Sequence, residues 1–228
     1  MSNSDTLHGV VTARLEIFQK RLLRWTTNHL RIYPWREQAT PYRILIAEVL
    51  LRRTTSKAVA RIYEPFIGRY PDCGTLAVAE IRELEDSLRP IGFHKQRARM
   101  LRETMEYIEE SHNGRIPDSY DDLLEIPNIG PYIAGAVLSL AYGLRFAMVD
   151  TNVERIISRV FKHTLPERGR LRRVQDTVEV LLPPEPVATF NLGLLDLGAL
   201  VCSYRWTKCD VCPLNAICDY YEDLSSSQ

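Results

Sequence analysis

Four cysteines close to the C-terminus constrain this chain more than any other feature of its sequence. They follow the spacing C-x6-C-x2-C-x5-C and are Cys202, Cys209, Cys212 and Cys218. A loop this compact can wrap one metal centre. Four thiolates fit a [4Fe–4S] cluster or a zinc ion, although structural zinc usually uses two close pairs and ferredoxins use other spacings. Disulfide bonds are not expected, because the number of cysteines is odd, four of them are clustered and the chain shows no secretory signal. We predict that the fifth cysteine, Cys73, is a structural residue.

The rest of the sequence predicts an all-α protein. Apolar residues recur at steps of three and four in several segments, and alternating strand patterns are scarce. Thr40-Pro41 is a good N-cap and first turn for the helix that contains Glu48. Asp118 is the expected cap of a short helix that ends at Pro127, and Asn113-Gly114 should stop the helix before it.

Charge and hydropathy exclude some classes of function. Lys and Arg total 29 and Asp and Glu total 29, so the net charge is zero. Binding to nucleic acid therefore requires basic residues to be segregated onto one face. No apolar run approaches the ~18 residues that a membrane span needs. The N-terminus has no visible secretory signal, so the chain is expected to be intracellular.

A second motif joins two predicted helices at residues 124–135, with the sequence Leu-Glu-Ile-Pro-Asn-Ile-Gly-Pro-Tyr-Ile-Ala-Gly. Asn128 and Gly130 tolerate positive φ, which allows a very tight turn. Such a turn leaves backbone N–H groups exposed at a helix N-terminus, where they suit a phosphate oxygen. A plain corner between two helices explains the same pattern equally well.

Two carboxylates stand out from their surroundings. Glu48 lies in an apolar helix, where a carboxylate is costly unless paired and where a raised pKa suits proton donation. A core salt bridge with Arg52 or Arg53 is the simpler explanation. Asp150 precedes a predicted helix, so it is either a catalytic carboxylate or only the N-cap of that helix.

These features occur together, in this order, in one family. Over residues 30–220 the chain resembles the helix-hairpin-helix DNA glycosylases of the endonuclease III superfamily, in the iron–sulfur branch. The shared elements are Tyr33-Pro34-Trp35-Arg36, the Glu48 helix, the hairpin at 126–135, Val149-Asp150-Thr151-Asn152, Asn191-Leu192-Gly193 and the four-cysteine loop. The resemblance favours a [4Fe–4S] cluster over zinc as the cofactor.

The resemblance implies an all-α, two-lobed, endonuclease III-like fold with an active-site cleft between the lobes. The first lobe is a six-helix barrel at residues 31–145, with the helix-hairpin-helix at about 118–142. The second lobe is a discontinuous iron–sulfur domain made of residues 1–30 and 146–228, with its cluster loop at 202–218.

Tyr132 separates the branches of this family. Endonuclease III-type enzymes carry a Lys at this hairpin position that attacks the sugar, and a phenol cannot form the corresponding imine. The chain is most similar to glycosylases of G·T mismatches, which have Tyr here and the motif Leu-Leu-Arg-Arg-Thr-Thr, present at residues 50–55. The resemblance implies a monofunctional base excision repair enzyme that flips out thymine or uracil opposite guanine and hydrolyses its N-glycosidic bond. Little or no lyase activity at abasic sites is expected.

Two alternatives remain open. An adenine DNA glycosylase that acts on A·8-oxoguanine or A·G mismatches shares the Glu48 and Asp150 positions, but usually has Ser at the hairpin position. A lesion-binding protein without catalysis needs neither carboxylate.

The resemblance also implies roles for single residues. Asp150 would stabilise the sugar cation and help to activate water, Glu48 would contact or protonate the departing base, and Tyr132 would line the base pocket. Basic, polar and turn residues and one apolar wedge, Leu192, would contact DNA: Arg53, Ser56, Asn128, Gly130, Leu192, Arg205 and Lys208. The implied partner is double-stranded DNA with mismatched or damaged bases. The protein is expected to be a monomer without membrane contact, cytoplasmic and nucleoid-associated in a prokaryote.

Overall fold

A computed structural model describes residues 3–165 and 170–226 of the chain. It confirms the predicted all-α class, because the regular elements in these ranges are helices, joined by one isolated antiparallel bridge between Cys202 and Thr207. None of the described helices combines the length and the apolar character that a membrane crossing requires. The predicted second lobe includes residues 1–2, 166–169 and 227–228, which lie outside the described residues.

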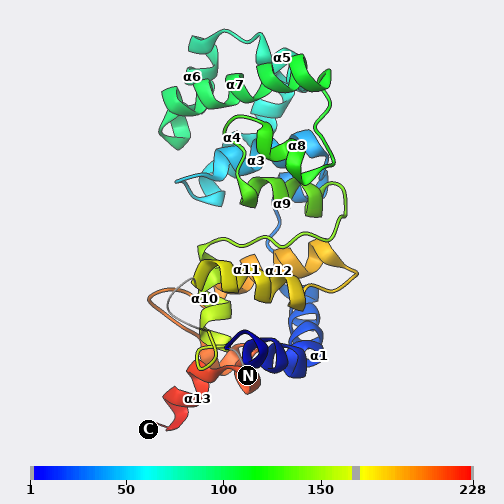
Figure 1. The fold of residues 1–228 in the computed structure, drawn as a ribbon. Helices are drawn as coiled ribbons and strands as arrows, with labels where there is room; N and C mark the ends of the chain where they lie inside the picture. Colours follow the sequence, from blue (N-terminus) through cyan, green and yellow to red (C-terminus); the bar gives the residue numbers. More distant parts are fainter. Residues whose placement is uncertain (1–2, 166–169, 227–228) are drawn as a thin grey trace. The chain divides into compact units, whose positions relative to one another are not determined.

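The chain divides into two compact units (Figure 1). The central unit is Ile32–Leu144, and the terminal unit combines Met1–Arg31 with Arg145–Gln228. The central unit is therefore one continuous stretch of chain, whereas the terminal unit is assembled from both ends of the sequence.

The central unit is a bundle of mostly short helices built around α3. Its helices are α2 (Pro34–Glu37), α3 (Pro41–Leu51), α4 (Ser56–Arg69), α5 (Cys73–Ala77), α6 (Ile81–Leu88), the 3-10 turn η1 (Arg89–Ile91), α7 (His94–His112), α8 (Tyr120–Glu125) and α9 (Pro131–Leu140). Helix α3 packs against α4, α7 and α9, and its residues 44–50 are all buried. Its predicted cap is confirmed, since the Thr40 hydroxyl accepts a hydrogen bond from the Arg43 N–H at 3.3 Å.

The helix before the hairpin begins one residue later than the sequence predicted. Its N-cap is Ser119, whose hydroxyl accepts the Asp122 N–H at 3.4 Å, so the prediction of Asp118 was wrong. Serine caps a helix as well as aspartate does, and this register places Asp121 and Asp122 in the first turn, at the positive end of the helix dipole.

The terminal unit packs the first helix of the chain against its last ones. Helix α1 (Asn3–His29) contacts α11 (Arg170–Leu181) and α12 (Val187–Leu200), and α10 (Thr151–Val160) contacts α11, α12 and α13 (Asp219–Ser226). Phe18 lies at the core, with its ring centroid 6.3 Å from Phe161 and 6.1 Å from Phe190. Residues 202–218, which contain the four clustered cysteines and are called the cysteine segment below, run between α12 and α13. They include the 3-10 turns η2 (Cys209–Val211) and η3 (Asn215–Ile217).

Two glycines allow α12 to lie close to its neighbours. A Cβ atom at Gly193 would lie 2.2 Å from Thr26 Oγ1 on α1, and a Cβ atom at Gly198 would lie 2.6 Å from the Asn152 Cβ on α10. Real Cβ atoms do not approach other atoms so closely, so a side chain at either position would force Thr26 or Asn152, or the helix that carries it, to shift. The absence of a side chain at Gly198 thus allows α12 to pack closely against the first turn of α10.

Candidate functional site

Asp150 is the N-cap of α10, which is one of the two roles that the sequence suggested for it. One carboxylate oxygen accepts the backbone N–H groups of Asn152 and Val153, both at 2.8 Å. The other accepts the side-chain amide of Asn152 at 2.7 Å. The carboxylate remains partly exposed. These three hydrogen bonds fix its orientation, which is also what a catalytic carboxylate requires.

A chain of hydrogen bonds connects Asp150 to the cysteine segment. The Arg155 guanidinium donates to Asn152 Oδ1 at 2.9 Å, to the Gly198 carbonyl at 2.8 Å and to the Cys202 carbonyl at 2.7 Å. Sequence reasoning missed Arg155. The available signal was its position three residues after Asn152, which places both side chains on one face of a helix.

Asn191 fixes the segment that leads to Asp150. It is fully buried on α12, its amide donates to the Phe146 carbonyl at 2.8 Å, and its oxygen accepts the Met148 N–H at 3.2 Å. Two residues of the Asn191-Leu192-Gly193 motif therefore have structural roles: Asn191 fixes this segment, and Gly193 allows α12 to pack closely against α1. Leu192, the predicted wedge, lies half-buried between them.

The four cysteines of the cysteine segment line one pocket of the terminal unit. Arg159, Leu214 and Tyr220 complete its wall, among other residues. Arg159 donates from Nη1 to the Cys202 Sγ at 3.2 Å and to the Ser203 carbonyl at 3.0 Å, and its guanidinium lies over the Tyr220 ring. Arg159 therefore connects α10 to the first cysteine of the segment and to the residue that follows it.

Burial affects three of the thiols. It raises the pKa of Cys212 to about 12 and also raises the pKa of Cys218. Burial raises the pKa of Cys73 to about 12 as well, with smaller contributions from the charges of Glu109 and Asp72. Cys73 is 3% exposed on α5, where it packs as an apolar residue.

Glu48 and Tyr132 lie on two helices of the central unit that pack against each other. Glu48 is 6% exposed on α3, and Tyr132 is half-buried in the first turn of α9. Arg52 and Arg53, the residues of the alternative salt-bridge interpretation, are both exposed at the end of α3. The guanidinium of Arg53 lies 5.9 Å from the centroid of the Phe93 ring.

The hairpin between α8 and α9 has the tight turn that its sequence predicted. Asn128 has φ 69, in the left-handed region, and its side-chain amide donates to Glu103 Oε2 at 3.0 Å. The Thr104 hydroxyl donates to the Pro127 carbonyl at 2.8 Å, so α7 holds the turn from behind. Gly130 caps α9 without a side-chain hydrogen bond, and the space where its Cβ would lie is open. Helix α9 begins at Pro131, which has no N–H, so its first backbone donors are those of Tyr132 and Ile133.

A buried arginine fixes the loop after α3. Arg97 on α7 is 4% exposed, and its guanidinium donates to the carbonyls of Val49 and Leu50, each at 3.0 Å, and to those of Arg52 and Gly92. These acceptors include the negative end of the α3 dipole, which offsets the buried charge. Burial, and secondarily the charge of Arg52, lowers the pKa of Arg97.

The remaining predicted DNA contacts lie at or near the surface. Ser56 is half-buried at the start of α4, and Arg205 and Lys208 are exposed in the cysteine segment. Tyr204 and Trp206 flank Arg205 and are 84% and 81% exposed. The Ser203 hydroxyl bonds to both the N–H and the carbonyl of Trp206 and so closes this turn.

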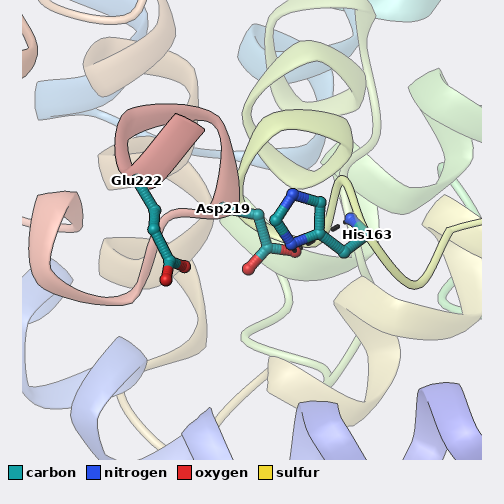
Figure 2. A group of neighbouring side chains, drawn as sticks. All are labelled: His163, Asp219 and Glu222. Carbon is teal, nitrogen blue, oxygen red and sulfur yellow. Dashed lines mark hydrogen bonds and ion pairs between the residues drawn. The ribbon is translucent and has the colours of Figure 1, made fainter. Parts of the chain in front are cut away.

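A second group of ligand-type side chains lies at the start of α13. Among the described residues, His163, Asp219 and Glu222 place one ligand atom each within 4.8 Å of one another, and Figure 2 shows His163 beside Asp219. Asp219 is 2% exposed and accepts Arg14 Nη1 and the His163 N–H, at 2.6 and 2.9 Å. This group is therefore part of an ion-pair network that fastens α13 to α1 and to the turn after α10.

Comparisons with known proteins place these features in context. Residues 46–176 match the family described as "HhH-GPD superfamily base excision DNA repair protein". The thymine-DNA glycosylase of Aeropyrum pernix is 39% identical over 92% of this chain and 96% of its own length. The thymine/uracil-DNA glycosylase of Methanothermobacter thermautotrophicus is 34% identical, with the same two coverages of 92% and 96%. A solved structure of a thermostable thymine-DNA glycosylase matches with a TM-score of 0.89 at 33% identity, over 93% of this chain and 98% of that one.

Proposed function

Because this chain belongs to the HhH-GPD superfamily of base excision DNA repair proteins, we propose that it removes thymine and uracil mispaired with guanine from double-stranded DNA. The chain is a DNA glycosylase, an enzyme that hydrolyses the bond between a base and its deoxyribose. The observation that carries the choice of substrate is the similarity over nearly the whole chain to glycosylases named for thymine and uracil. Tyr132 supports a monofunctional reaction, since a phenol cannot form a Schiff base with the sugar.

The proposed reaction begins when the mispaired nucleotide leaves the duplex. A mispaired base costs less to extrude than a paired one, which contributes to selection of the mismatch. As the bond between N1 of the base and C1′ of the sugar breaks, the base leaves with negative charge and the sugar becomes an oxocarbenium-like cation. The carboxylate of Asp150, fixed by Asn152 and Val153, stabilises this cation and orients the attacking water.

Glu48 and Tyr132 are proposed to act on the base. A buried carboxylate on α3 suits a hydrogen bond to the flipped pyrimidine or to a water molecule that protonates it as it leaves. The half-buried ring of Tyr132 on α9 suits packing against the base. Uracil differs from thymine by the loss of one methyl group, so a pocket that admits thymine has room for uracil.

The proposed DNA contacts combine a helix N-terminus with basic side chains. The turn at Asn128 and Gly130 leads into the N-terminus of α9, where the positive end of the helix dipole suits a phosphate oxygen, and no atom lies within 4 Å of the place where a Cβ of Gly130 would be. The exposed residues Arg53, Arg205 and Lys208 would contact phosphates, with Ser56 as a polar contact and Leu192 as a candidate wedge.

We propose a [4Fe–4S] cluster as the cofactor, held by Cys202, Cys209, Cys212 and Cys218. The four thiols line one pocket, and Arg159 donates to one of the sulfurs. Structural zinc usually uses two close cysteine pairs, whereas this segment has a single C-x2-C pair flanked by single cysteines, so the spacing in sequence favours the cluster. The cluster would stabilise the fold of the cysteine segment. It would not take part in the hydrolysis, which needs no electron transfer.

We further propose that the enzyme acts as a monomer on the DNA of the nucleoid.

One panel of DNA substrates tests the proposed glycosylase activity directly. Holoprotein is incubated with end-labelled duplexes that carry G·T, G·U, A·8-oxoguanine or A·G, and each sample is analysed with and without alkali. Alkali-dependent cleavage at T or U opposite G is expected. Cleavage at adenine would instead identify an adenine glycosylase. Binding without cleavage on all duplexes would overturn the enzymatic proposal.

A further inference from the structure

A basic groove lies along α1, outside the residues that the proposed reaction uses. Its lining residues come from one stripe of α1 and from the cysteine segment, and they are Ile17, Lys20, Arg21, Arg24, Trp25 and Pro213, with Asn28 at the end. The groove has a volume of about 720 Å³, which is within the range of ligand-binding sites. We propose that it binds an acidic amphipathic helix of a partner protein.

The groove is built from side chains at helical spacing. Positions 17, 20, 21, 24, 25 and 28 recur at steps of three and four, so they share one face of α1. Arg21 donates from Nη1 to the Pro213 carbonyl at 3.2 Å, which connects this face to the cysteine segment. The indole of Trp25 is stacked on the His29 ring, with the centroids 4.6 Å apart and the planes at 7°. Two residues of the apolar floor, Trp25 and Pro213, therefore each have a contact within the chain itself.

The charge of the groove has one sign. Lys20, Arg21 and Arg24 are exposed cations, and no carboxylate is among the described residues that line the groove. The whole chain is neutral, with 29 basic and 29 acidic residues, so this face represents a local segregation of charge. Such a surface attracts an acidic partner over a distance of about one Debye length.

The floor of the groove favours a peptide over nucleic acid. Ile17 is 46% exposed, and Trp25 and Pro213 are half-buried beside it. A phosphate backbone would neutralise the cations but leave these apolar surfaces in water. An amphipathic helix covers the apolar floor with one face and pairs its flanking carboxylates with the basic rim, which is the usual mode of helix-in-groove binding.

The test uses a fluorescein-labelled synthetic helix with leucines on one face and glutamates on both flanks. Fluorescence anisotropy measures its binding to the holoprotein. We expect micromolar affinity that falls with increasing salt, and at least a tenfold loss for the double variant Lys20→Glu/Arg24→Glu. A matched control is Lys57→Glu/Arg61→Glu on α4, which reverses two exposed cations at the same helical spacing and should bind the peptide as the wild type does.

Two further measurements separate the possible outcomes. A peptide of the same composition, permuted so that it has no apolar face, should bind at least tenfold more weakly. Base release from a G·T duplex by Lys20→Glu/Arg24→Glu should stay within about twofold of wild type. The proposal is overturned if the wild type does not bind the peptide, if both double variants bind it equally, or if the α1 variant loses affinity for duplex DNA instead.

Discussion

Asn152 donates to both oxygens of the Asp150 carboxylate, with its backbone N–H to one oxygen at 2.8 Å and its side-chain amide to the other at 2.7 Å. The carboxylate that caps α10 through one of its oxygens is thus held in a single orientation by both. The two interpretations of Asp150, as a helix cap and as a catalytic carboxylate, are compatible because one set of hydrogen bonds serves both.

Two substitutions at this position separate its roles. Asp150→Asn keeps a good cap but removes the negative charge, so base release should fall by about 10²–10⁴-fold while the melting temperature changes little. Asp150→Ala should lose the same activity and also about 1 kcal/mol of stability. Single-turnover base release and thermal unfolding measure the two effects. Turnover of Asp150→Asn at the wild-type rate would refute the assigned mechanism.

An amine at residue 132 should change the chemistry of the enzyme. Tyr132→Lys places a nucleophile in the first turn of α9, so we expect strand nicking and a protein–DNA adduct that borohydride traps. Tyr132→Phe, which has no amine, is the matched control and should give no adduct. If folded Tyr132→Lys protein yields none either, the position of Tyr132 relative to the sugar has been assigned incorrectly.

Substitution of two helical glycines by alanine should change the free energy of unfolding in opposite directions, because Gly198 lies where α12 approaches α10 and Gly9 lies in open space. Gly198→Ala places a methyl group against Asn152 and should lower the free energy of unfolding by about 1–3 kcal/mol. Gly9→Ala, at an exposed position of α1 where nothing lies within 4 Å of the added Cβ, should raise it by about 0.5–1 kcal/mol. Denaturant titrations of both variants check the difference in sign.

Arg97 should be among the most sensitive residues of the central unit. Arg97→Met leaves the carbonyls at the end of α3 without their donor and should cost about 3 kcal/mol of stability. Arg97→Lys restores fewer of these bonds, so its loss should be intermediate. Arg99→Met, on the exposed face of the same helix, should change stability by less than about 0.5 kcal/mol. Equal losses for Arg97→Met and Arg99→Met would contradict the assigned role of the guanidinium.

The thiol of Cys73 should resist alkylation in the folded protein. Its pKa of about 12 leaves only a trace of thiolate near neutral pH, and the thiolate is the reactive form. Iodoacetamide should therefore modify Cys73 after denaturation but not before, as mass spectrometry of the labelled peptides would show. Rapid labelling under native conditions would mean that α5 opens readily to solvent.

Local chemistry explains which features the sequence predicted correctly. The Thr40 cap, the stop at Asn113 and the left-handed turn at Asn128 each depend on a few neighbouring residues, and all three are confirmed. Asp118 and Ser119 are adjacent residues of equal capping ability, so the sequence could not decide between them. The roles assigned to Glu48, Tyr132 and the DNA-contacting residues stay predictions.

The interactions that escaped prediction join distant parts of the chain. Arg97 bonds to a carbonyl 47 positions away, and Arg155 bonds to the Cys202 carbonyl, also 47 positions away. Backbone carbonyls carry no sequence signature, so nothing in the sequence marks them as partners of a particular arginine. The approach of Gly198 to Asn152 is likewise visible only when α10 and α12 are packed.

The discontinuity of the terminal unit also sets an order of events during synthesis. Arg14 on α1 pairs with Asp219, which the ribosome adds 205 positions later, whereas all residues of the central unit belong to one continuous stretch. All helices of the central unit can therefore pack together before α11, α12 and α13, the later helices of the terminal unit, have been synthesised. The apolar stripe of α1 is synthesised before α11 and α12 and can be buried against them only after both have been made, so it stays exposed on the nascent chain for longer than the core of the central unit.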